Sequence, residues 1–408
     1  MAQKDLGFYD QLEARGVTRR DFLKFCGTMT AILGLSEGMA PAIASAVEGA
    51  AGSSLFPAVW MDGGLCTGCT ESVAQVTKPD IATILLDILS LNYMETISMS
   101  QGEHAEEALH ETATHNEGKF VLVYEGSVMT GLDGNLLRVA EKTSLESLKE
   151  IGSKAAAIIA VGSCAVDGGW VRSVPSVKAD GYPQEPEAWA TGVSQYLASQ
   201  NINTPVINLP CCPVNPEWVV AMIIDAVMLG GIDADGKVTA AFASKLDEEG
   251  RPKSIYGQTI HDNCPRRGHF ENGEFVYKFG SPEEAAGYCL YPVGCKGPQT
   301  KTNCPVVRWN DKASWCVESG APCIGCGNFN WVDENAPFLG RFRNIGLGMK
   351  KPVNPAAAAT VVGGVAVAAL AAHGFGMKAA GRIGAGAPME KMKDWDRKHG
   401  ASKKGGDK

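Results

Sequence analysis

The sequence predicts an α/β protein with a parallel sheet in its N-terminal part, an irregular second part and one C-terminal helix long enough to cross a membrane. Three observations support this prediction. Short apolar runs alternate with helical patterns up to about residue 230, as in sheets that are covered by helices on both faces. Residues 231–349 contain many glycine, proline and asparagine residues and little periodicity. A charge-free stretch then covers residues 355–372.

The strands of the predicted sheet are the apolar runs at residues 56–60, 120–124, 156–161 and 205–209, and helices are expected at residues 144–151 and 217–229. Three of these runs lead directly into turns that contain Cys66, Cys164 and Cys212. Ligands in open α/β sheets bind at the carboxyl ends of the strands. We therefore expect these cysteines, although far apart in the sequence, to share one site.

The composition limits the classes of protein to which the chain can belong. Of its 408 residues, 45% are apolar and 20% are charged, so it can build a sizeable core, which argues against global disorder. The length suits two domains with appendages. The formal net charge of −8 argues against a nucleic-acid partner, because no basic surface dominates.

The first fifty residues contain a targeting signal. T-R-R-D-F-L-K (Thr18–Lys24) is a twin-arginine export motif, followed by a mildly apolar stretch (29–35) and by small residues typical of a cleavage site (42–46). We therefore predict a twin-arginine signal peptide over residues 1–46. This export route carries folded proteins together with their cofactors, which a metal-bearing protein needs.

The C-terminal end contains a second targeting signal. A helix over residues 355–372 would be about 27 Å long, close to the roughly 30 Å thickness of a bilayer core. The stretch is rich in alanine and glycine, so a flexible low-complexity tail is the alternative. Gly364, Ala368 and Ala372 recur every four residues, as at helix contacts within membranes. We predict a transmembrane helix over residues 350–378 and a basic cytoplasmic tail over residues 379–408.

The thirteen cysteines are the most informative residues. Twelve lie between Cys66 and Cys326, and with one histidine they supply three groups of four possible metal ligands. The first group is Cys66, Cys69, Cys164 and Cys212; the second is His261, Cys264, Cys289 and Cys295; the third is Cys304, Cys316, Cys323 and Cys326. Three thiolate-rich sites on one chain indicate a route for electrons.

Two other uses of these cysteines remain open from the spacing. Disulfides are natural in an oxidising compartment, and four thiolates also suit zinc. Against disulfides, C-x-x-C pairs such as Cys66 and Cys69 suit chelation, and the pair of His261 and Cys264 is explained only by ligation. Three closely spaced sites on one exported chain favour iron–sulfur clusters over structural zinc.

These motifs together resemble a known family. The chain carries R-R-D-F-L-K, then W-x-x-G-x-x-C-T-G-C-T-E-S (Trp60–Ser72), V-G-S-C-A (Val161–Ala165), H-x-x-C, C-L-Y-x-x-G-C-K-G-P (Cys289–Pro298) and P-C-I-G-C. In this combination it resembles the small subunit of membrane-bound [NiFe] hydrogenases, from about residue 18 to the C-terminus.

The resemblance implies a fold and a set of cofactors. A flavodoxin-like domain, here residues 47–230, would hold a proximal [4Fe–4S] cluster on the first group. A second domain, residues 231–349, would hold a distal [4Fe–4S] cluster on the second group, with His261 as its one histidine ligand, and a medial cluster on the third group. The nickel–iron centre would belong to a separate large subunit.

The medial group departs from the commoner family pattern. Many relatives have proline at the position of Cys316, which leaves three thiolates and a [3Fe–4S] cluster. Because a thiolate at Cys316 can bind a fourth iron, we predict a medial [4Fe–4S] cluster with a lowered potential. The alternatives are a free thiol at Cys316 and a [3Fe–4S] cluster.

Further positions near the proximal group are implied by the resemblance. The family places Glu71 and Glu125 near this cluster, where a carboxylate could relay protons or tune the potential. Oxygen-tolerant members carry two extra cysteines at the positions of Gly68 and Gly169, so the chain resembles an oxygen-sensitive enzyme. Cys211 is either a small hydrophobic residue or one that adjusts a cluster.

The function implied by the resemblance is electron transfer in a hydrogenase. Electrons from H2 oxidation on the large subunit would pass through the proximal, medial and distal clusters to a membrane acceptor. That acceptor would be a b-type cytochrome, another quinone-linked integral subunit or a c-type cytochrome, and the enzyme would lie on the periplasmic side of the inner membrane. The alternative is an iron–sulfur electron-transfer subunit of another exported oxidoreductase; such relatives generally lack the H-x-x-C motif.

Overall fold

The computed structural model of the chain describes residues 7–14, 16–51, 56–76, 89–173, 189–335, 338–339 and 355–380. The chain forms two compact units, Met1–Phe342 and Arg343–Lys408, and each is described by itself. The predicted basic tail lies outside the described residues except for positions 379 and 380.

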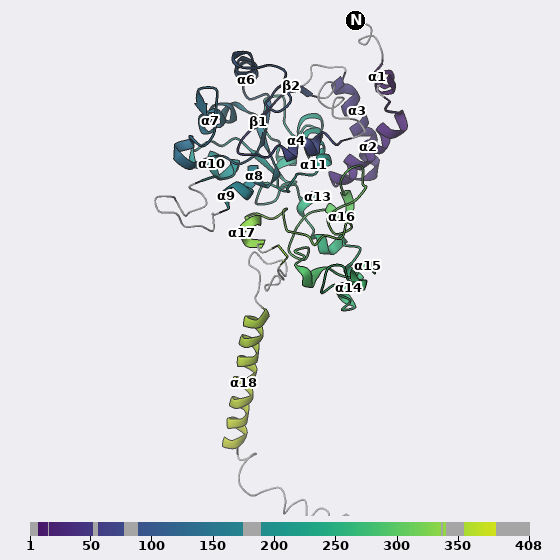
Figure 1. The fold of residues 1–408 in the computed structure, drawn as a ribbon, viewed down its shortest axis with the longest axis vertical. Coiled ribbons are helices and arrows are strands. Elements are labelled where there is room, and N and C mark those ends of the chain that lie inside the picture. Colours follow the sequence, from purple (N-terminus) through teal and green to yellow (C-terminus); the bar gives the residue numbers. More distant parts are fainter. Residues whose placement is uncertain are drawn as a thin grey trace, which may run out of the picture. The chain divides into compact units, whose positions relative to one another are not determined.

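A five-stranded parallel sheet forms the centre of the first unit (Figure 1). Its strands are β1 (Phe56–Asp62), β2 (Leu89–Met94), β3 (Val121–Glu125), β6 (Ala157–Val161) and β7 (Val206–Leu209). They lie in the order β2-β1-β3-β6-β7, and each neighbouring pair is parallel. Counted along the chain this order is 2-1-3-4-5, which is the flavodoxin-like order. The predicted α/β fold with a parallel sheet is confirmed.

Helices cover both faces of this sheet. One face packs against α6 (Glu103–His115), α7 (Ser144–Lys154) and α10 (Val193–Ser199). The other packs against α11 (Pro216–Ile223) and the π-helical turn η5 (Ile224–Met228), which α2 (Arg19–Ile32) and α3 (Ala40–Ala51) contact in turn. In β3, Leu122 and Tyr124 face the first set of helices, whereas Val121 and Val123 face the second. Because side chains in a strand alternate between the two sides, this double cover explains the nearly continuous apolar runs.

The remaining elements of the sheet region are short. They are α4 (Gly68–Val73), η3 (Gly131–Gly134), the two-stranded ribbon of β4 (Arg138–Val139) and β5 (Lys142–Thr143), α8 (Gly162–Asp167) and α9 (Gly169–Arg172). Helix α8 follows β6 without a gap, and α4 begins a few residues after β1. These two short helices therefore hold cysteines at the carboxyl ends of their strands.

Strand β2 is not among the predicted strands, although the other four strands match the predicted runs closely. Its sequence, L-S-L-N-Y-M, places Ser90 and Asn92 between apolar residues, and both are at least partly exposed. An edge strand with one partly solvated face lacks the uninterrupted apolar run on which the prediction relied. The predicted helix over residues 217–229 is present as α11 and η5.

The described residues of the predicted signal peptide are packed within the first unit. They form α1 (Phe8–Ala14), α2, η1 (Glu37–Met39) and α3. Phe22, Cys26 and Met29 of α2 are fully buried, and α2 contacts α11 while α3 contacts η5. Arg19 and Arg20 remain exposed at the start of α2. The signal-peptide assignment stays a prediction; what the structure adds is that the apolar side of this segment is buried.

The part from residue 231 to 339 contains only short helices among its described residues. They are α12 (Ala240–Ala243), α13 (Lys253–Tyr256), η6 (Ile260–Asn263), α14 (Arg267–Glu271), α15 (Pro282–Ala285), η7 (Tyr291–Val293), α16 (Cys304–Val307) and α17 (Trp331–Asn335). This matches the irregular second part expected from the sequence. Its core joins that of the sheet region, because Trp218 packs edge-on against Tyr256 and Trp309 at ring-centroid distances of 5.5 and 6.1 Å.

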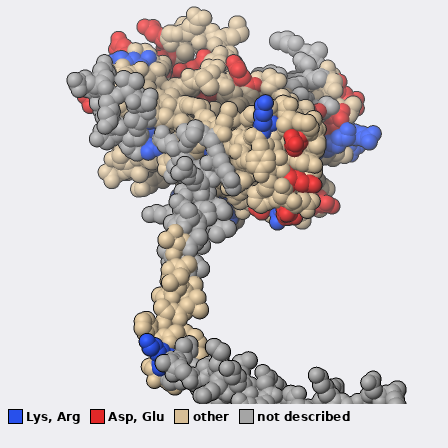
Figure 2. All heavy atoms as spheres, turned by 60° about the horizontal axis from the view of Figure 1, so that its bottom comes forward, with Lys and Arg blue, Asp and Glu red and all other residues tan. Residues whose placement is uncertain are grey.

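The second unit contains the helix α18 (Pro355–Ala379). Its described surface is uncharged up to the last turn, which contains Lys378 (Figure 2). Among the described residues, however, no helix combines the length and the apolar character that a membrane crossing requires. The helix itself is confirmed, but its predicted transmembrane character is not, since alanine and glycine contribute little apolar area per residue.

Candidate metal centres

The proximal group (Cys66, Cys69, Cys164 and Cys212) is assembled at the carboxyl ends of three strands. Cys66 follows β1, Cys69 lies in α4, Cys164 lies in α8 directly after β6, and Cys212 follows β7. The backbone between the first two cysteines turns through the left-handed region at Thr67, where φ is +60°. The structure thus brings together cysteines that are almost 150 residues apart, as the strand pattern predicts.

These four thiols influence one another electrostatically. Burial, and then the charges of Cys326, Cys164 and Cys66, raise the pKa of Cys212 to about 12. Burial is also the main cause that raises the pKa of Cys69, to which Glu125, Cys164 and Cys212 contribute as negative neighbours. Buried thiols of this kind lose their protons only when a bound cation stabilises the thiolates.

Glu125, at the end of β3, contacts the proximal group through the backbone. Its Oε1 accepts the N–H of Cys69 at 3.0 Å, and its Oε2 accepts the N–H of Thr70 at 3.0 Å and the Thr70 hydroxyl at 2.5 Å. Burial raises the pKa of this carboxyl, while the hydrogen bonds from Thr70 and Cys69 oppose that rise. Its predicted place beside the first group is therefore observed. Glu71, on the same short helix α4, is exposed.

Glycines around the proximal sulfurs leave no space for a side chain. A Cβ atom at Gly162, where φ is +82°, would lie 2.5 Å from the Cys69 sulfur. A Cβ atom at Gly169 would lie 2.9 Å from the Cys164 sulfur, and one at Gly68 would lie 3.2 Å from the Cys66 sulfur. The backbone thus forms a close cradle for the sulfurs of this group.

The medial group (Cys304, Cys316, Cys323 and Cys326) lies in the second part of the unit. Cys304 begins α16, and its sulfur is 2.9 Å from the Thr302 hydroxyl. Cys323 is buried, whereas the Cys316 side chain keeps an exposed face. The atoms packed around Cys316, followed by Cys326 and Cys304 as negative neighbours, still raise its pKa to about 11. The structure therefore brings all four predicted residues into one neighbourhood.

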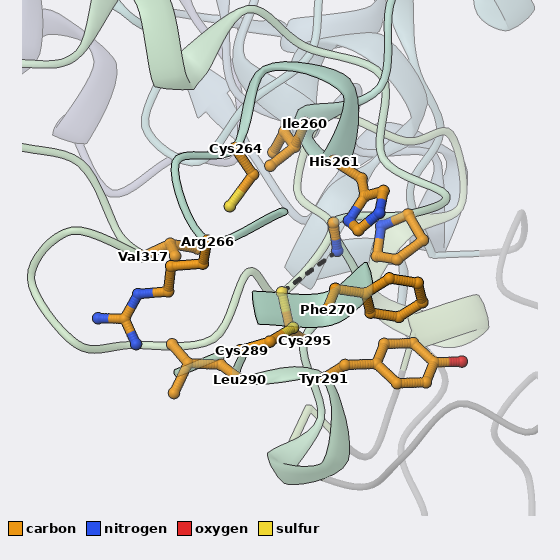
Figure 3. Close-up of a pocket in the computed structure, with 12 residues that line it drawn as sticks. Ile260, His261, Cys264, Arg266, Phe270, Cys289, Leu290, Tyr291, Cys295 and Val317 are labelled. Atoms are coloured by element: carbon orange, nitrogen blue, oxygen red, sulfur yellow. Dashed lines mark hydrogen bonds between the residues drawn. The ribbon is translucent and has the colours of Figure 1, made fainter. Parts of the chain in front are cut away.

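The distal group (His261, Cys264, Cys289 and Cys295) lines a cavity (Figure 3). His261 lies in η6 and Cys264 directly follows it, while Cys289 and Cys295 flank η7. The cavity walls are otherwise largely apolar, with Ile260, Phe270, Leu290 and Tyr291 among the lining residues. In Figure 3 the three cysteine side chains and the imidazole ring border the same space.

The distal ligands are oriented by their neighbours. The backbone N–H of Gly297 donates to the Cys295 sulfur at 3.4 Å. The His261 ring packs edge-on against Phe270, with 4.6 Å between the ring centroids. Burial, and then the charge of Arg267, lowers the pKa of His261. The shift favours the neutral imidazole, which is the form that binds metal.

The three groups are neighbours in a definite order. Cys326 of the medial group is among the charges that raise the pKa of Cys212 in the proximal group. At the other end, Cys295 of the distal group is the first of the charged neighbours that raise the pKa of buried Cys323. The backbone N–H of Lys296, next to Cys295, also donates to the Cys323 carbonyl at 2.8 Å. The medial group therefore lies between the other two.

The donor chemistry suits iron–sulfur clusters. All thirteen cysteines are free thiols, so the disulfide alternative is not observed. Within the described residues, three or more histidine, cysteine, aspartate or glutamate side chains nowhere converge on the position of a single metal ion. Soft, buried thiolates, with one imidazole near the surface, are the donors that iron–sulfur clusters use.

Comparisons with known proteins agree with this site. A family model for the C-terminal part of the NiFe/NiFeSe hydrogenase small subunit matches residues 256–339, and a model described as NADH ubiquinone oxidoreductase, 20 Kd subunit, matches residues 66–226. The periplasmic [NiFe] hydrogenase small subunit 1 of Nitratidesulfovibrio vulgaris is 38% identical over 332 residues, which are 81% of this chain and 96% of that protein. The chain belongs to the family of [NiFe] hydrogenase small subunits.

Other members of this hydrogenase family are similar over a comparable length. The quinone-reactive Ni/Fe-hydrogenase small chain of Wolinella succinogenes is 36% identical, over 80% of this chain and 85% of that protein. A solved [NiFeSe] hydrogenase structure from Desulfovibrio vulgaris Hildenborough superposes with a TM-score of 0.63 and 35% identity. It covers 71% of this chain and 99% of that one. The chain is thus part of an H2 oxidoreductase, in which small subunits carry iron–sulfur clusters and relay electrons.

At two residues of this hydrogenase site the structure goes beyond the sequence-based prediction. Lys296 is buried, with 1% of its surface exposed, between a distal and a medial cysteine. Cys211, predicted either as a small hydrophobic residue or as one that adjusts a cluster, has its sulfur 3.4 Å from that of Cys326. The sequence indicates Lys296 only as a surface cation that flanks the distal ligands, whereas the structure buries it. No sequence signal predicts the sulfur contact of Cys211, which joins residues 115 positions apart.

Proposed function

We propose that the proximal group holds a [4Fe–4S] cluster, the medial group a second [4Fe–4S] cluster with Cys316 as a ligand, and the distal group a third with His261 as a ligand. When bound, these clusters supply one-electron transfer between the nickel–iron centre of a large subunit and a membrane acceptor. The observation that carries this proposal is the order of the groups. Cys326 contacts Cys211, the neighbour of Cys212, at 3.4 Å between the sulfurs, and the Cys323 carbonyl accepts the N–H of Lys296, the neighbour of Cys295, at 2.8 Å.

The residues of this chain would fix the positions and the surroundings of the ligands. Glu125 ties the N-terminus of α4 to β3 and so holds Cys69 against the sheet. The N–H groups of Val214 and Gly297 point at the sulfurs of Cys69 and Cys295, each at 3.4 Å. Hydrogen bonds to ligand sulfurs stabilise the more negative, reduced state of a cluster. Burial excludes water from the same sulfurs.

The distal group suits the exit for electrons. His261 is only half-buried, and a neutral imidazole leaves less negative charge to be solvated than a fourth thiolate. The hydrogenase C-terminal family model includes this part of the chain, which favours hydrogenase over another exported oxidoreductase. A cation at Arg266, whose Nη1 donates to the Tyr288 carbonyl at 2.8 Å, would lie beside the exit.

We further propose that the protein works on the periplasmic side of a membrane and passes electrons to a b-type cytochrome or another quinone-linked subunit. The twin-arginine motif and the relative named quinone-reactive support this proposal. Helix α18 would contribute small residues, every fourth position, that suit close packing against a partner helix. Deleting residues 355–408 should release the enzyme from the membrane fraction; retention in that fraction would contradict this attachment.

The central test is cofactor analysis of the complex between this chain and its large subunit. Iron and acid-labile sulfide should be present in nearly equal amounts, and EPR of the reduced protein should show interacting [4Fe–4S] clusters. H2-dependent reduction of a dye should then accompany these signals. A complex without acid-labile sulfide would refute the proposed function.

A further inference from the structure

Cys211 lies between the proximal and the medial groups. It is 1% exposed, and its sulfur is 3.4 Å from the sulfur of Cys326 in the medial group. The next residue in the chain, Cys212, belongs to the proximal group. The Cys211 carbonyl accepts the N–H of Ser163, and the Ser163 hydroxyl donates to the Cys326 carbonyl at 2.8 Å. The backbone on both sides of the sulfur contact is therefore held in place.

The contact distance bears on what Cys211 can do. Two ligands on different iron atoms of one cluster are kept apart by the cluster, so a sulfur in direct contact with a ligand sulfur is poorly placed to be another ligand. At 3.4 Å the contact fits a hydrogen bond between sulfurs. Once Cys326 binds iron it is a thiolate and can only accept, so the proton in this contact must belong to Cys211. Full burial favours the neutral thiol at Cys211.

We propose that Cys211 is a positioning residue, whose S–H group donates a hydrogen bond to the Cys326 thiolate and raises the reduction potential of the medial cluster. This inference rests on the proposed function, because it presupposes a cluster on the medial group. A donor aimed at a ligand sulfur stabilises the reduced cluster more than the oxidised one, since the reduced cluster carries more negative charge. The effect should be confined to the medial cluster.

The test uses the purified complex with its large subunit. The variants Cys211→Ala and Cys211→Ser would be compared with the unchanged protein by redox titration followed by EPR. In Cys211→Ala the medial potential should become more negative, while the proximal and distal potentials stay the same. In Cys211→Ser a hydroxyl donor remains, so the medial potential should return toward that of the unchanged protein.

A matched control is Val219→Ala, which removes buried side-chain atoms from α11 and leaves the contact between Cys211 and Cys326 in place. Its medial potential should be unchanged; a shift as large as that of Cys211→Ala would indicate a packing effect and overturn the inference. An unchanged potential in Cys211→Ala would overturn it as well. A [3Fe–4S] signal in that variant would show that Cys211 is a ligand instead. Absence of clusters from the unchanged protein would refute the proposed function itself.

Discussion

The Glu125 carboxylate accepts the backbone N–H of Cys69 at 3.0 Å, so a side chain at the end of β3 fixes a proximal cysteine on α4. Replacing Glu125 by glutamine leaves one carbonyl oxygen for donors from Cys69 and Thr70 and turns an amide N–H2 toward them. We expect the variant Glu125→Gln to lose about 1–3 kcal/mol of unfolding free energy and part of its proximal cluster. Denaturant unfolding and iron content measure both effects.

The control for this prediction is Glu71→Gln on the same helix. Glu71 is exposed, so its replacement should change the unfolding free energy by less than about 0.5 kcal/mol. Equal effects of the two substitutions would show that the charge near α4, rather than the contact of Glu125 with the backbone, determines the stability.

The glycine cradle at the proximal group predicts a steric effect. In Gly162→Ala the new Cβ would lie 2.5 Å from the Cys69 sulfur, at a φ of +82°. We expect the proximal EPR signal to be lost. The matched control is Gly230→Ala, where φ is +73° but nothing lies within 4 Å of the added Cβ. It incurs the backbone strain of about 1 kcal/mol alone and should keep the proximal cluster; loss of the signal in both variants would assign the effect to strain.

Removal of the Cys316 thiol should change the type of the medial cluster. In Cys316→Ala three thiolates remain at that site, so we expect oxidised protein to show a [3Fe–4S] EPR signal that the unchanged protein lacks. The control Ser319→Ala alters an exposed neighbour and should leave the spectrum unchanged. If the unchanged protein already shows a strong [3Fe–4S] signal, Cys316 is not a ligand.

The sequence predicts the sheet well because the central strands of the sheet are buried on both faces. Strands such as β3 and β6 are therefore uninterrupted apolar runs in the sequence. The prediction misses β2, because this edge strand is partly exposed to solvent on one side and can contain the polar residues Ser90 and Asn92 there. The cysteines that share a site could be grouped because each follows a strand or lies in a compact motif. The sulfur contact between Cys211 and Cys326 could not be predicted, since it depends on how two distant loops pack.

The buried face of α2 also follows from tertiary packing that the sequence does not reveal. Its apolar residues, such as Phe22 and Met29, suit either a signal peptide or a core helix, and the structure buries them. A short apolar run flanked by arginines has the same appearance in both cases. The pattern is therefore the same for a signal peptide and for a core helix, and an export assay distinguishes the two.

The exposed arginine pair of α2 predicts how export depends on side-chain chemistry. Arg19 and Arg20 are both exposed, and a guanidinium makes planar, forked hydrogen bonds that an ammonium cannot make. Replacing both by lysine should therefore reduce the periplasmic fraction of the protein at least about tenfold, which corresponds to about 1.4 kcal/mol of recognition. Cell fractionation measures this. The same change at Arg266 and Arg267 keeps the net charge and should leave export intact; normal export of the first variant would exclude the twin-arginine route.

Asp62 and Glu95 predict a dependence of stability on pH. Burial is the main cause that raises the pKa of Asp62 to about 6 and that of Glu95 to about 7. The charge of Glu125 adds to the first shift, and the charges of Asp62 and Glu106 add to the second. Because these values exceed those of the unfolded chain, the folded protein binds more protons, so the contribution to stability is complete below about pH 4 and is lost as the pH rises to about 7.

The variant Glu95→Gln removes the charge and keeps an oxygen for the Asp62 N–H. The unfolding free energy of this variant, relative to that of the unchanged protein, should therefore be higher at about pH 8 than at about pH 5.5. The expected difference is about 1 kcal/mol after allowance for solvent screening. Thermal unfolding at the two pH values measures the gain, with the exposed Glu103→Gln as control; an equal gain in both variants would show that net charge alone is responsible.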